Sequence, residues 1–223
     1  MELAALRLTF QVALTSTALA VAVGLPFAWW LARARFPGRD LLSALVLLPM
    51  LLPPTVLGYF LLQMVGRESA VGGLLESVLG FSLVFHWSGA VLAAFVTSAP
   101  FLIRTAQAGF ESADPVYTEA ARTLGRSELA IFMTITIPLA WKAILAGTAM
   151  ALARAAGEFG ATLMLVGNVP GRTQTLSTAI YDAVQADRTG DAQIMAVTLA
   201  LVTLGLLVGI GTLAKGSTWS WRH

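Results

Sequence analysis

Cysteine is absent from the 223 residues, and charged side chains are scarce at 12%. Without cysteine the chain can hold neither a disulfide scaffold nor a thiolate metal site, and it has no cysteine nucleophile. Soluble domains usually carry about a quarter of their residues as charged side chains, so half that share excludes an ordinary water-soluble protein. The formal net charge of only +2 is spread over several segments, which favours a role in membrane topology over a nucleic-acid patch.

Long uncharged runs take the place of the missing charge. Four of them exceed twenty residues: Leu8–Ala32, Leu41–Val65, Ser77–Ile103 and Ala192–Ala214. An α-helix needs about 20 apolar residues to cross a bilayer. The first run is also longer than the apolar region of a cleaved signal peptide, about 7–15 residues, so we expect a retained first span. The sequence therefore predicts an all-α polytopic membrane protein, one transmembrane domain over residues 1–223 that lies in the lipid bilayer.

Five membrane spans follow from these runs and the polar segments between them. We place them at Thr9–Leu31, Leu41–Val65, Gly89–Ile103, Ile137–Ala156 and Ala192–Leu213. The second span contains Pro49, Pro53 and Pro54, so it is either a helix with a packing kink or a bent helix that lines a pathway. The fourth span is interrupted by Lys142 and Arg154.

The distribution of basic residues predicts the orientation of these spans. An outer N-terminus leaves nine basic residues in the cytoplasm, namely Arg33, Arg35, Arg39, Arg104, Arg122, Arg126, Lys142, Lys215 and Arg222. Four face out, namely Arg7, Arg67, Arg172 and Arg188. Because basic residues are enriched in cytoplasmic loops, we expect this orientation. It places the polar loop of about residues 104–130 in the cytoplasm.

A short helix is predicted inside this loop. Asp114 and Pro115 are typical of a helix start, with Asp as the N-cap and Pro in the first helical position. Gly125 is suited to the left-handed conformation that often ends a helix. Between them, Ala120 and Ala121 form a small-residue face that would fit a cleft on a partner protein, although the spacing alone favours an ordinary surface helix.

The order of residues in this loop resembles the EAA loop of permeases from ATP-binding-cassette (ABC) importers. Glu119-Ala120-Ala121 is followed by Gly125 and, after nine further residues, by Ile135-Thr136-Ile137-Pro138. The family pattern ends Ile-x-Leu-Pro, so Ile137 is a conservative departure. The resemblance implies a type I importer fold whose cytoplasmic coupling helix docks into a groove of a separate ATPase subunit. The coupling residues that it implies are Glu119, Ala120, Ala121, Gly125 and Pro138.

Three further segments are similar to permeases of molybdate importers: Leu52–Tyr59, Gly157–Ala161 and Asn168–Gly171. Sulfate permeases have a similar Gly-Glu-Phe-Gly-Ala run, whereas the other two segments favour molybdate. The resemblance implies ATP-driven import of molybdate, or tungstate, across the bacterial inner membrane. It also implies a homodimer that works with two ATPase copies and a periplasmic molybdate-binding protein. A sulfate or thiosulfate permease is the alternative.

Motifs for chemistry are missing from the sequence. It contains no G-x-x-x-x-G-K-[ST] motif, so the hydrolysis of ATP must come from another subunit. We expect no enzymatic activity, no cofactor and no nucleic-acid partner. An ion-coupled secondary transporter is a second hypothesis, but it would need several intramembrane acids, and only Glu158 qualifies.

Arg154 and Glu158 are the charged residues that we expect inside the membrane. They are four residues apart and therefore share a helical face. Arg154 lies about 24 Å beyond Pro138 along a helix, towards the outer side. We favour a structural ion pair near an outer gate over an arginine that attracts the anion, because intramembrane charges usually pair. The candidate pathway or gate residues are Pro53, Pro54, Thr55, Arg154 and Glu158.

Overall fold

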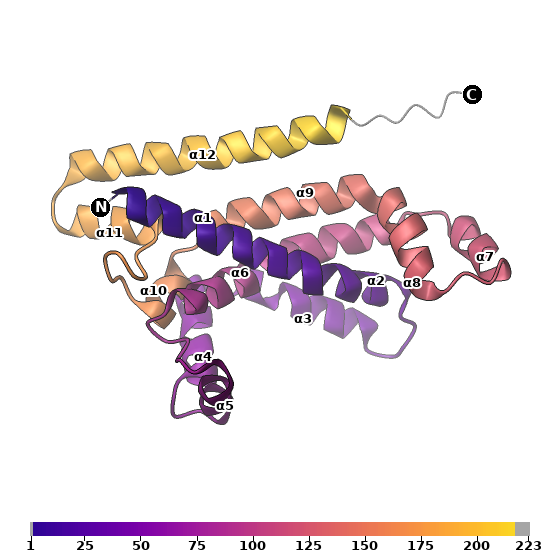
Figure 1. Cartoon of the computed structure of the whole chain (residues 1–223), viewed down its shortest axis with the longest axis horizontal. Helices are drawn as coiled ribbons and strands as arrows, with labels where there is room; N and C mark the ends of the chain where they lie inside the picture. Colours follow the sequence, from indigo (N-terminus) through magenta and orange to yellow (C-terminus); the bar gives the residue numbers. More distant parts are fainter. Residues whose placement is uncertain (1, 217–223) are drawn as a thin grey trace.

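The computed structural model describes residues 2–216, and within that range the regular elements are all helices (Figure 1). In chain order they are α1 (Glu2–Leu19), the π-helix η1 (Ala20–Gly24), α2 (Leu25–Arg33), α3 (Arg39–Leu51), α4 (Pro54–Val65), α5 (Ala70–Leu79), α6 (Trp87–Glu111), α7 (Pro115–Thr123), α8 (Glu128–Ile131), the π-helix η2 (Phe132–Thr136), α9 (Ile137–Ala156), α10 (Gly160–Val166), α11 (Leu176–Gln185) and α12 (Thr189–Gly216). Arg222, which we assigned to a cytoplasmic tail, lies outside the described residues.

Four helical rods are long and apolar enough to cross a membrane: Leu3–Arg33, Trp87–Glu111, Glu128–Ala156 and Thr189–Thr212. They agree with the first, third, fourth and fifth predicted spans. The second rod, Trp87–Glu111, however, continues eight residues past Ile103, into the segment that we predicted as a loop. The helix can continue because Arg104 donates to Gln107 (3.0 Å) and Gln107 donates to Glu111 (2.9 Å), so these polar groups find partners along one face.

The second predicted span is broken rather than continuous. Helices α3 and α4 meet at an angle of 109°, and Leu52 and Pro53 between them have extended backbone. Two consecutive prolines remove two backbone donors, and each disfavours helical geometry in the residue before it. The segment is therefore broken at Leu52 and Pro53 and not merely kinked, while its role in lining a pathway stays a prediction.

Two wide turns in the rods also precede a proline. The π-helix η1 ends two residues before Pro26, and η2 ends two residues before Pro138. A proline inside a helix lacks the N–H donor, and its ring clashes with the carbonyl of the previous turn. A widened π turn relieves both problems, so each rod stays continuous through its proline.

Helix α6 is at the centre of the bundle and packs most extensively against α9. A Cβ on Gly109 would lie 2.5 Å from the Cβ of Ala143, and one on Gly147 would lie 3.1 Å from the Cα of Leu102. Small residues thus bring the two helices close together, as is common in membrane bundles. Helix α12 lies on the outside of the bundle in Figure 1.

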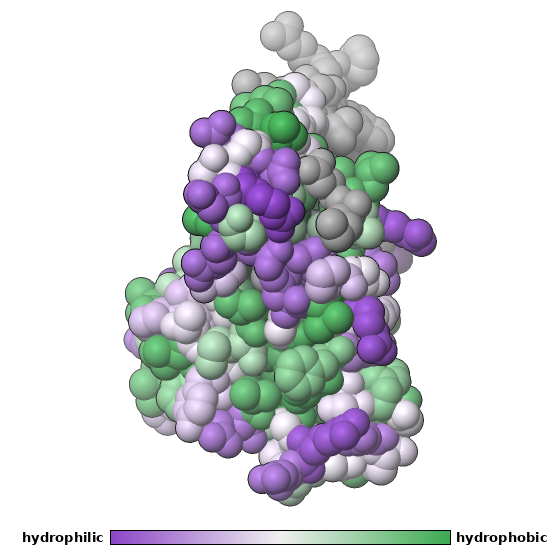
Figure 2. Space-filling model, turned by 90° about the vertical axis from the view of Figure 1, so that its left-hand side faces the viewer, coloured by the Kyte–Doolittle hydropathy of each residue, from purple (hydrophilic) through white to green (hydrophobic). Residues whose placement is uncertain are grey.

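The long rods run roughly side by side in one direction, so the molecule has two distinct ends (Figure 1). One end carries α11 and the start of α1, with α4 and α5 projecting from the side of the bundle nearer to it, and the other end carries α7 and α8. Figure 2 shows the first end, where hydrophilic residues gather in the upper part and at the lower edge, with hydrophobic side chains between them.

Candidate coupling helix and gate

The coupling-type helix α7 begins where the sequence predicts. The Asp114 Oδ1 atom accepts a hydrogen bond from the Val116 N–H at 2.9 Å, and Pro115 is the first helical residue. This N-cap satisfies a donor that would otherwise be free at the helix start, and the proline requires no donor there.

The end of α7 is a Schellman turn built on Gly125. The backbone φ of Gly125 is +76°. The Gly125 N–H donates to the carbonyl of Arg122 (2.9 Å), and the Arg126 N–H donates to the carbonyl of Ala121 (3.1 Å). These two bonds close the helix as the motif requires, so the predicted end of the helix is confirmed.

The two alanines of the motif differ in burial. Ala121 is only 6% exposed and packs inside the chain. The prediction that it belongs to an exposed alanine face is therefore wrong. Ala120 and Glu119 are exposed. Thr118 is buried as well, at 8% exposed, and its hydroxyl donates to the carbonyl of Pro115 at 2.9 Å.

Three apolar side chains that the sequence analysis missed complete the exposed face of α7. Val116, Tyr117 and Leu124 are large and exposed, with Leu124 at 82%. With Ala120 they are spaced at intervals of one, three and four residues, which places them on one side of a helix. We call Val116, Tyr117, Ala120 and Leu124 the apolar stripe. Its spacing within a polar loop is the sequence signal that could have revealed it.

Glu128 connects α7 to the first rod by ion pairs. Its Oε1 atom lies 2.5 Å from Arg122 Nε, and its Oε2 atom lies 2.9 Å from Arg33 Nη1. The hydrogen bond with Glu128 raises the pKa of Arg122 above its usual value. Arg33 also lies over the ring of Trp29 at 4.6 Å, which is a cation–π geometry.

The candidate gate residues come together at the other end of the molecule. A Cβ on Gly160 would lie 2.8 Å from the Cβ of Pro54 and 3.3 Å from the backbone nitrogen of Thr55, so α10 packs tightly on the start of α4. Gly58 continues this contact, because its Cβ would lie 2.8 Å from the Cα of Ala161. Two segments about 100 residues apart, 53–59 and 157–161, are therefore direct neighbours. Pro53, Pro54 and Thr55 lie on the exposed side of this contact.

Arg154 and Glu158 form the ion pair that we predicted. Arg154 Nη2 lies 2.7 Å from Glu158 Oε2, and the Glu158 side chain is only 2% exposed. Glu158 Oε1 also accepts the N–H of Ala161 at 2.9 Å. The carboxylate thereby joins the end of α9 to the first turn of α10, while Arg154 remains partly exposed.

The predicted site residues thus form two groups at opposite ends of α9. Pro138 lies in its first turn, near η2 and α8, whereas Arg154 lies in its last turn. In Figure 1 the first group is at the α7 end and the second is near α10. The coupling residues and the gate residues do not touch each other, but α9 is a continuous element between them.

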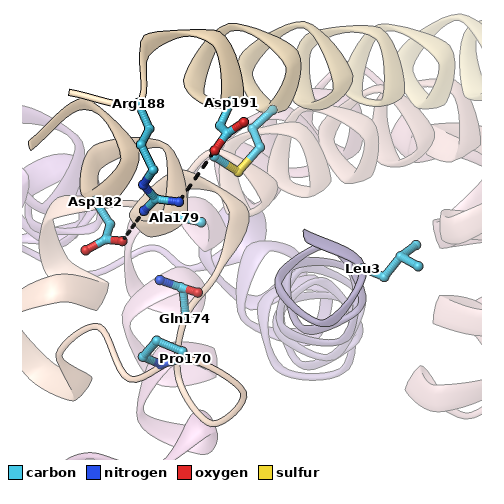
Figure 3. Close-up of a pocket in the computed structure, with 8 residues that line it drawn as sticks. Leu3, Pro170, Gln174, Ala179, Asp182, Arg188 and Asp191 are labelled. Atoms are coloured by element: carbon cyan, nitrogen blue, oxygen red, sulfur yellow. Dashed lines mark hydrogen bonds and ion pairs between the residues drawn. The ribbon is translucent and has the colours of Figure 1, made fainter. Parts of the chain in front are cut away.

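A pocket of about 420 Å³ opens between α11, the first turns of α12 and the start of α1, at the end of the molecule opposite α7 (Figure 3). Arg188 points into it, between Asp182 at 3.0 Å and Asp191 at 3.5 Å. Because two carboxylates already face this guanidinium, the pocket offers an anion little net attraction. Pro170, from the predicted segment Asn168–Gly171, lines the same pocket.

Comparison with known proteins agrees with this arrangement. Residues 24–214 match the family described as "Binding-protein-dependent transport system inner membrane component". The chain is 40% identical over 209 residues to the molybdenum transport system permease protein ModB of Escherichia coli K12, covering 93% of this chain and 91% of that one. It is 35% identical to the sulfate transport system permease protein CysT of Salmonella typhimurium over 210 residues, covering 94% and 76% of the two chains.

A solved bacterial alginate ABC transporter, in complex with an alginate-bound periplasmic protein, has the same fold. Its TM-score is 0.76 at 17% identity, covering 98% of this chain and 80% of that one. Fold, family match and identity therefore agree: the chain belongs to the family of inner membrane components of binding-protein-dependent transport systems.

Proposed function

We propose that this chain is the permease subunit of an ATP-driven importer that moves molybdate, or the closely similar tungstate, from the periplasm to the cytoplasm. The observation that carries the proposal is the 40% identity to ModB over 93% of the chain. The identity to a sulfate permease is lower, at 35%, which makes sulfate the second candidate. The importer would consist of two copies of this chain in the bacterial inner membrane, two ATPase subunits and a periplasmic molybdate-binding protein.

The apolar stripe of α7 is the proposed docking surface for the ATPase. Large apolar side chains on a short helix in a polar loop favour contact with another protein. Glu119 lies beside the stripe and is exposed, so its charge would be available to a partner. We assign Ala120 to direct contact, Ala121 and Gly125 to the shape of the helix, and Pro138 to the rod that follows it.

The end of the molecule where α4 packs on α10 is the proposed gate, through which the substrate would enter from the periplasm. Pro53, Pro54 and Thr55 lie on the surface of a single chain, so a pathway lined by them requires a second surface, which the second copy would supply. The ion pair of Arg154 with Glu158 leaves little net charge beside this path. A transported dianion would therefore pass without being held there, because a strong site would slow its release.

Uptake by the reconstituted importer tests the substrate. Proteoliposomes with the cognate ATPase and binding protein should accumulate labelled molybdate when ATP is present inside. Unlabelled tungstate should compete well, and sulfate and thiosulfate should compete poorly. A preference for sulfate would reassign the chain to sulfate transport, and uptake that follows an ion gradient without ATP would overturn the importer itself.

A substitution in the stripe tests the docking surface. Ala120→Trp adds a large ring at the centre of the exposed face and should abolish co-purification with the ATPase. Ala70→Trp is the matched control, because Ala70 is exposed in the first turn of another short helix, α5. If Ala120→Trp retains the ATPase and transports at the wild-type rate, α7 is not the docking element.

A further inference from the structure

A cavity separates α7 from the transmembrane bundle. It has a volume of about 500 Å³ and is lined by Ala32 and Arg33 near the end of α2, by Phe110 of α6 and by Pro115, Thr118 and Arg122 of α7. Helix α7 packs mainly against the two elements that follow it in the chain, α8 and η2. Close apolar packing, which transmits displacement between helices, is therefore interrupted between α7 and α2.

The Glu128 carboxylate connects the two helices across this cavity. One oxygen pairs with Arg122 on α7 at 2.5 Å, and the other pairs with Arg33 on α2 at 2.9 Å. The second oxygen also lies 3.2 Å from Arg122 Nη2, so the Arg122 contact is bidentate. A two-point contact between a guanidinium and a carboxylate fixes direction as well as distance.

The contacts continue from Arg33 into the apolar core. Its guanidinium covers the Trp29 ring, and Trp29 lies 4.7 Å from Phe132 of η2, measured between ring centroids. The ring of Phe132 lies 6.2 Å from that of Phe110 on α6. Aromatic pairs at these distances are in van der Waals contact or close to it. Arg33 is thus held from both sides, by Glu128 and by the aromatic cluster.

We propose that Glu128 is a positioning residue that ties the coupling helix to the first membrane rod, so that displacement of α7 reaches α2 through this carboxylate. The inference rests on the proposed docking of an ATPase at α7. It assigns the link between the docking surface and the bundle to a residue that lies between the defining positions of the EAA-like motif and is not one of them.

The expected effect is on coupling rather than on stability. Exposed ion pairs contribute little to folding, and the Glu128 side chain is 51% exposed. Glu128→Gln keeps the shape but removes the charge that orients both arginines. The variant should fold, insert and retain the ATPase through the apolar stripe, because no residue of the stripe is altered. The number of molybdate ions transported per ATP hydrolysed should fall by about twofold or more, which is the lower limit of the coupling between residues of one ion-pair network.

Glu76→Gln is the matched control. Glu76 forms an exposed ion pair with Arg67 at 3.4 Å, on α5 and far from α7 in Figure 1. Its loss should leave the transport ratio at the wild-type value.

A double-substitution cycle separates positioning from a general structural role. Arg33→Gln should lower the transport ratio as much as Glu128→Gln does, and the double variant should be no worse than either single one, because both remove the same link. Effects that multiply, or a wild-type ratio in Glu128→Gln, would overturn the inference. The docking proposal is tested separately by Ala120→Trp. If that variant loses the ATPase while Glu128→Gln is normal, only the role of Glu128 is wrong.

Discussion

Glu158 is a buried carboxylate with two structural partners. One oxygen faces Arg154, and the other accepts a backbone N–H in the first turn of α10. A buried charge is tolerated when it is paired and hydrogen-bonded, and both conditions hold here. The same residue therefore neutralises the membrane charge and fixes the helix that packs on Pro54.

Unequal losses are expected when the two members of this pair are removed. Glu158→Ala removes the buried charge itself and leaves a partly exposed arginine, so its cost should be the smaller one. Arg154→Ala should lower the free energy of unfolding by about 3 kcal/mol, because it leaves the buried Glu158 carboxylate without its counter-charge. Adding Glu158→Gln to Arg154→Ala should recover part of that loss, since no unpaired charge then remains. Thermal unfolding in detergent measures all three variants. Normal stability of Arg154→Ala with loss of uptake alone would instead assign Arg154 to the anion pathway.

Gly125 offers a test of backbone conformation without a steric effect. A Cβ at this position would meet no atom within 4 Å, while its φ is +76°. The left-handed conformation costs most residues about 1–2 kcal/mol, and asparagine adopts it more readily. Gly125→Val should therefore loosen the end of α7 and weaken co-purification with the ATPase, whereas Gly125→Asn should stay near wild type. Equal behaviour of the two variants would contradict a role for this turn.

At the scale of elements, the contact between α4 and α10 depends on glycine. A Cβ on Gly58 would lie 2.7 Å from the Cβ of Met164, which is too close for the helices to keep their separation. Gly58→Ala should destabilise the protein by about 1–3 kcal/mol, as over-packing does, and should slow uptake. Gly73→Ala in α5 is the control, because its Cβ would meet only a carbonyl oxygen at 3.9 Å. Equal thermal unfolding of both variants would contradict this prediction.

Local signals predicted elements well where one physical cause dominates. The limits of α7 follow from Asp114, Pro115 and Gly125, and the first, third and fifth spans follow from uncharged runs. The sequence could not distinguish the break at Pro53 from a kink. Two prolines weaken a helix, but the angle between α3 and α4 also depends on the close packing of α4 against α10, which the sequence does not reveal. The orientation of Ala121 was missed for a similar reason, since it depends on which side of α7 packs against the chain. Glu128 carried no signal, because its partners lie 6 and 95 residues away.

At the scale of the whole molecule, the charges agree with a single direction through the membrane. Arg33, Arg39 and Arg122 lie at the α7 end, where they pair with Glu128 and Glu111. Arg188 lies at the other end, near the start of α12. The basic excess of cytoplasmic loops therefore favours a cytoplasmic α7, provided that the broken pair α3 and α4 crosses the membrane once.

The absence of cysteine allows this topology to be tested without background labelling. Single cysteines at the exposed residues Thr123 on α7, Ser77 on α5 and Gln185 on α11 would be treated with a membrane-impermeant maleimide. We expect Ser77→Cys and Gln185→Cys to react in intact cells, and Thr123→Cys to react only after permeabilisation. If the broken pair returned to its own side without crossing, Ser77 would share the side of Phe36, and α6 would carry Thr123 to the opposite side. Labelling of Thr123→Cys in intact cells would therefore contradict both the crossing of α3 and α4 and the docking of a cytoplasmic ATPase at α7.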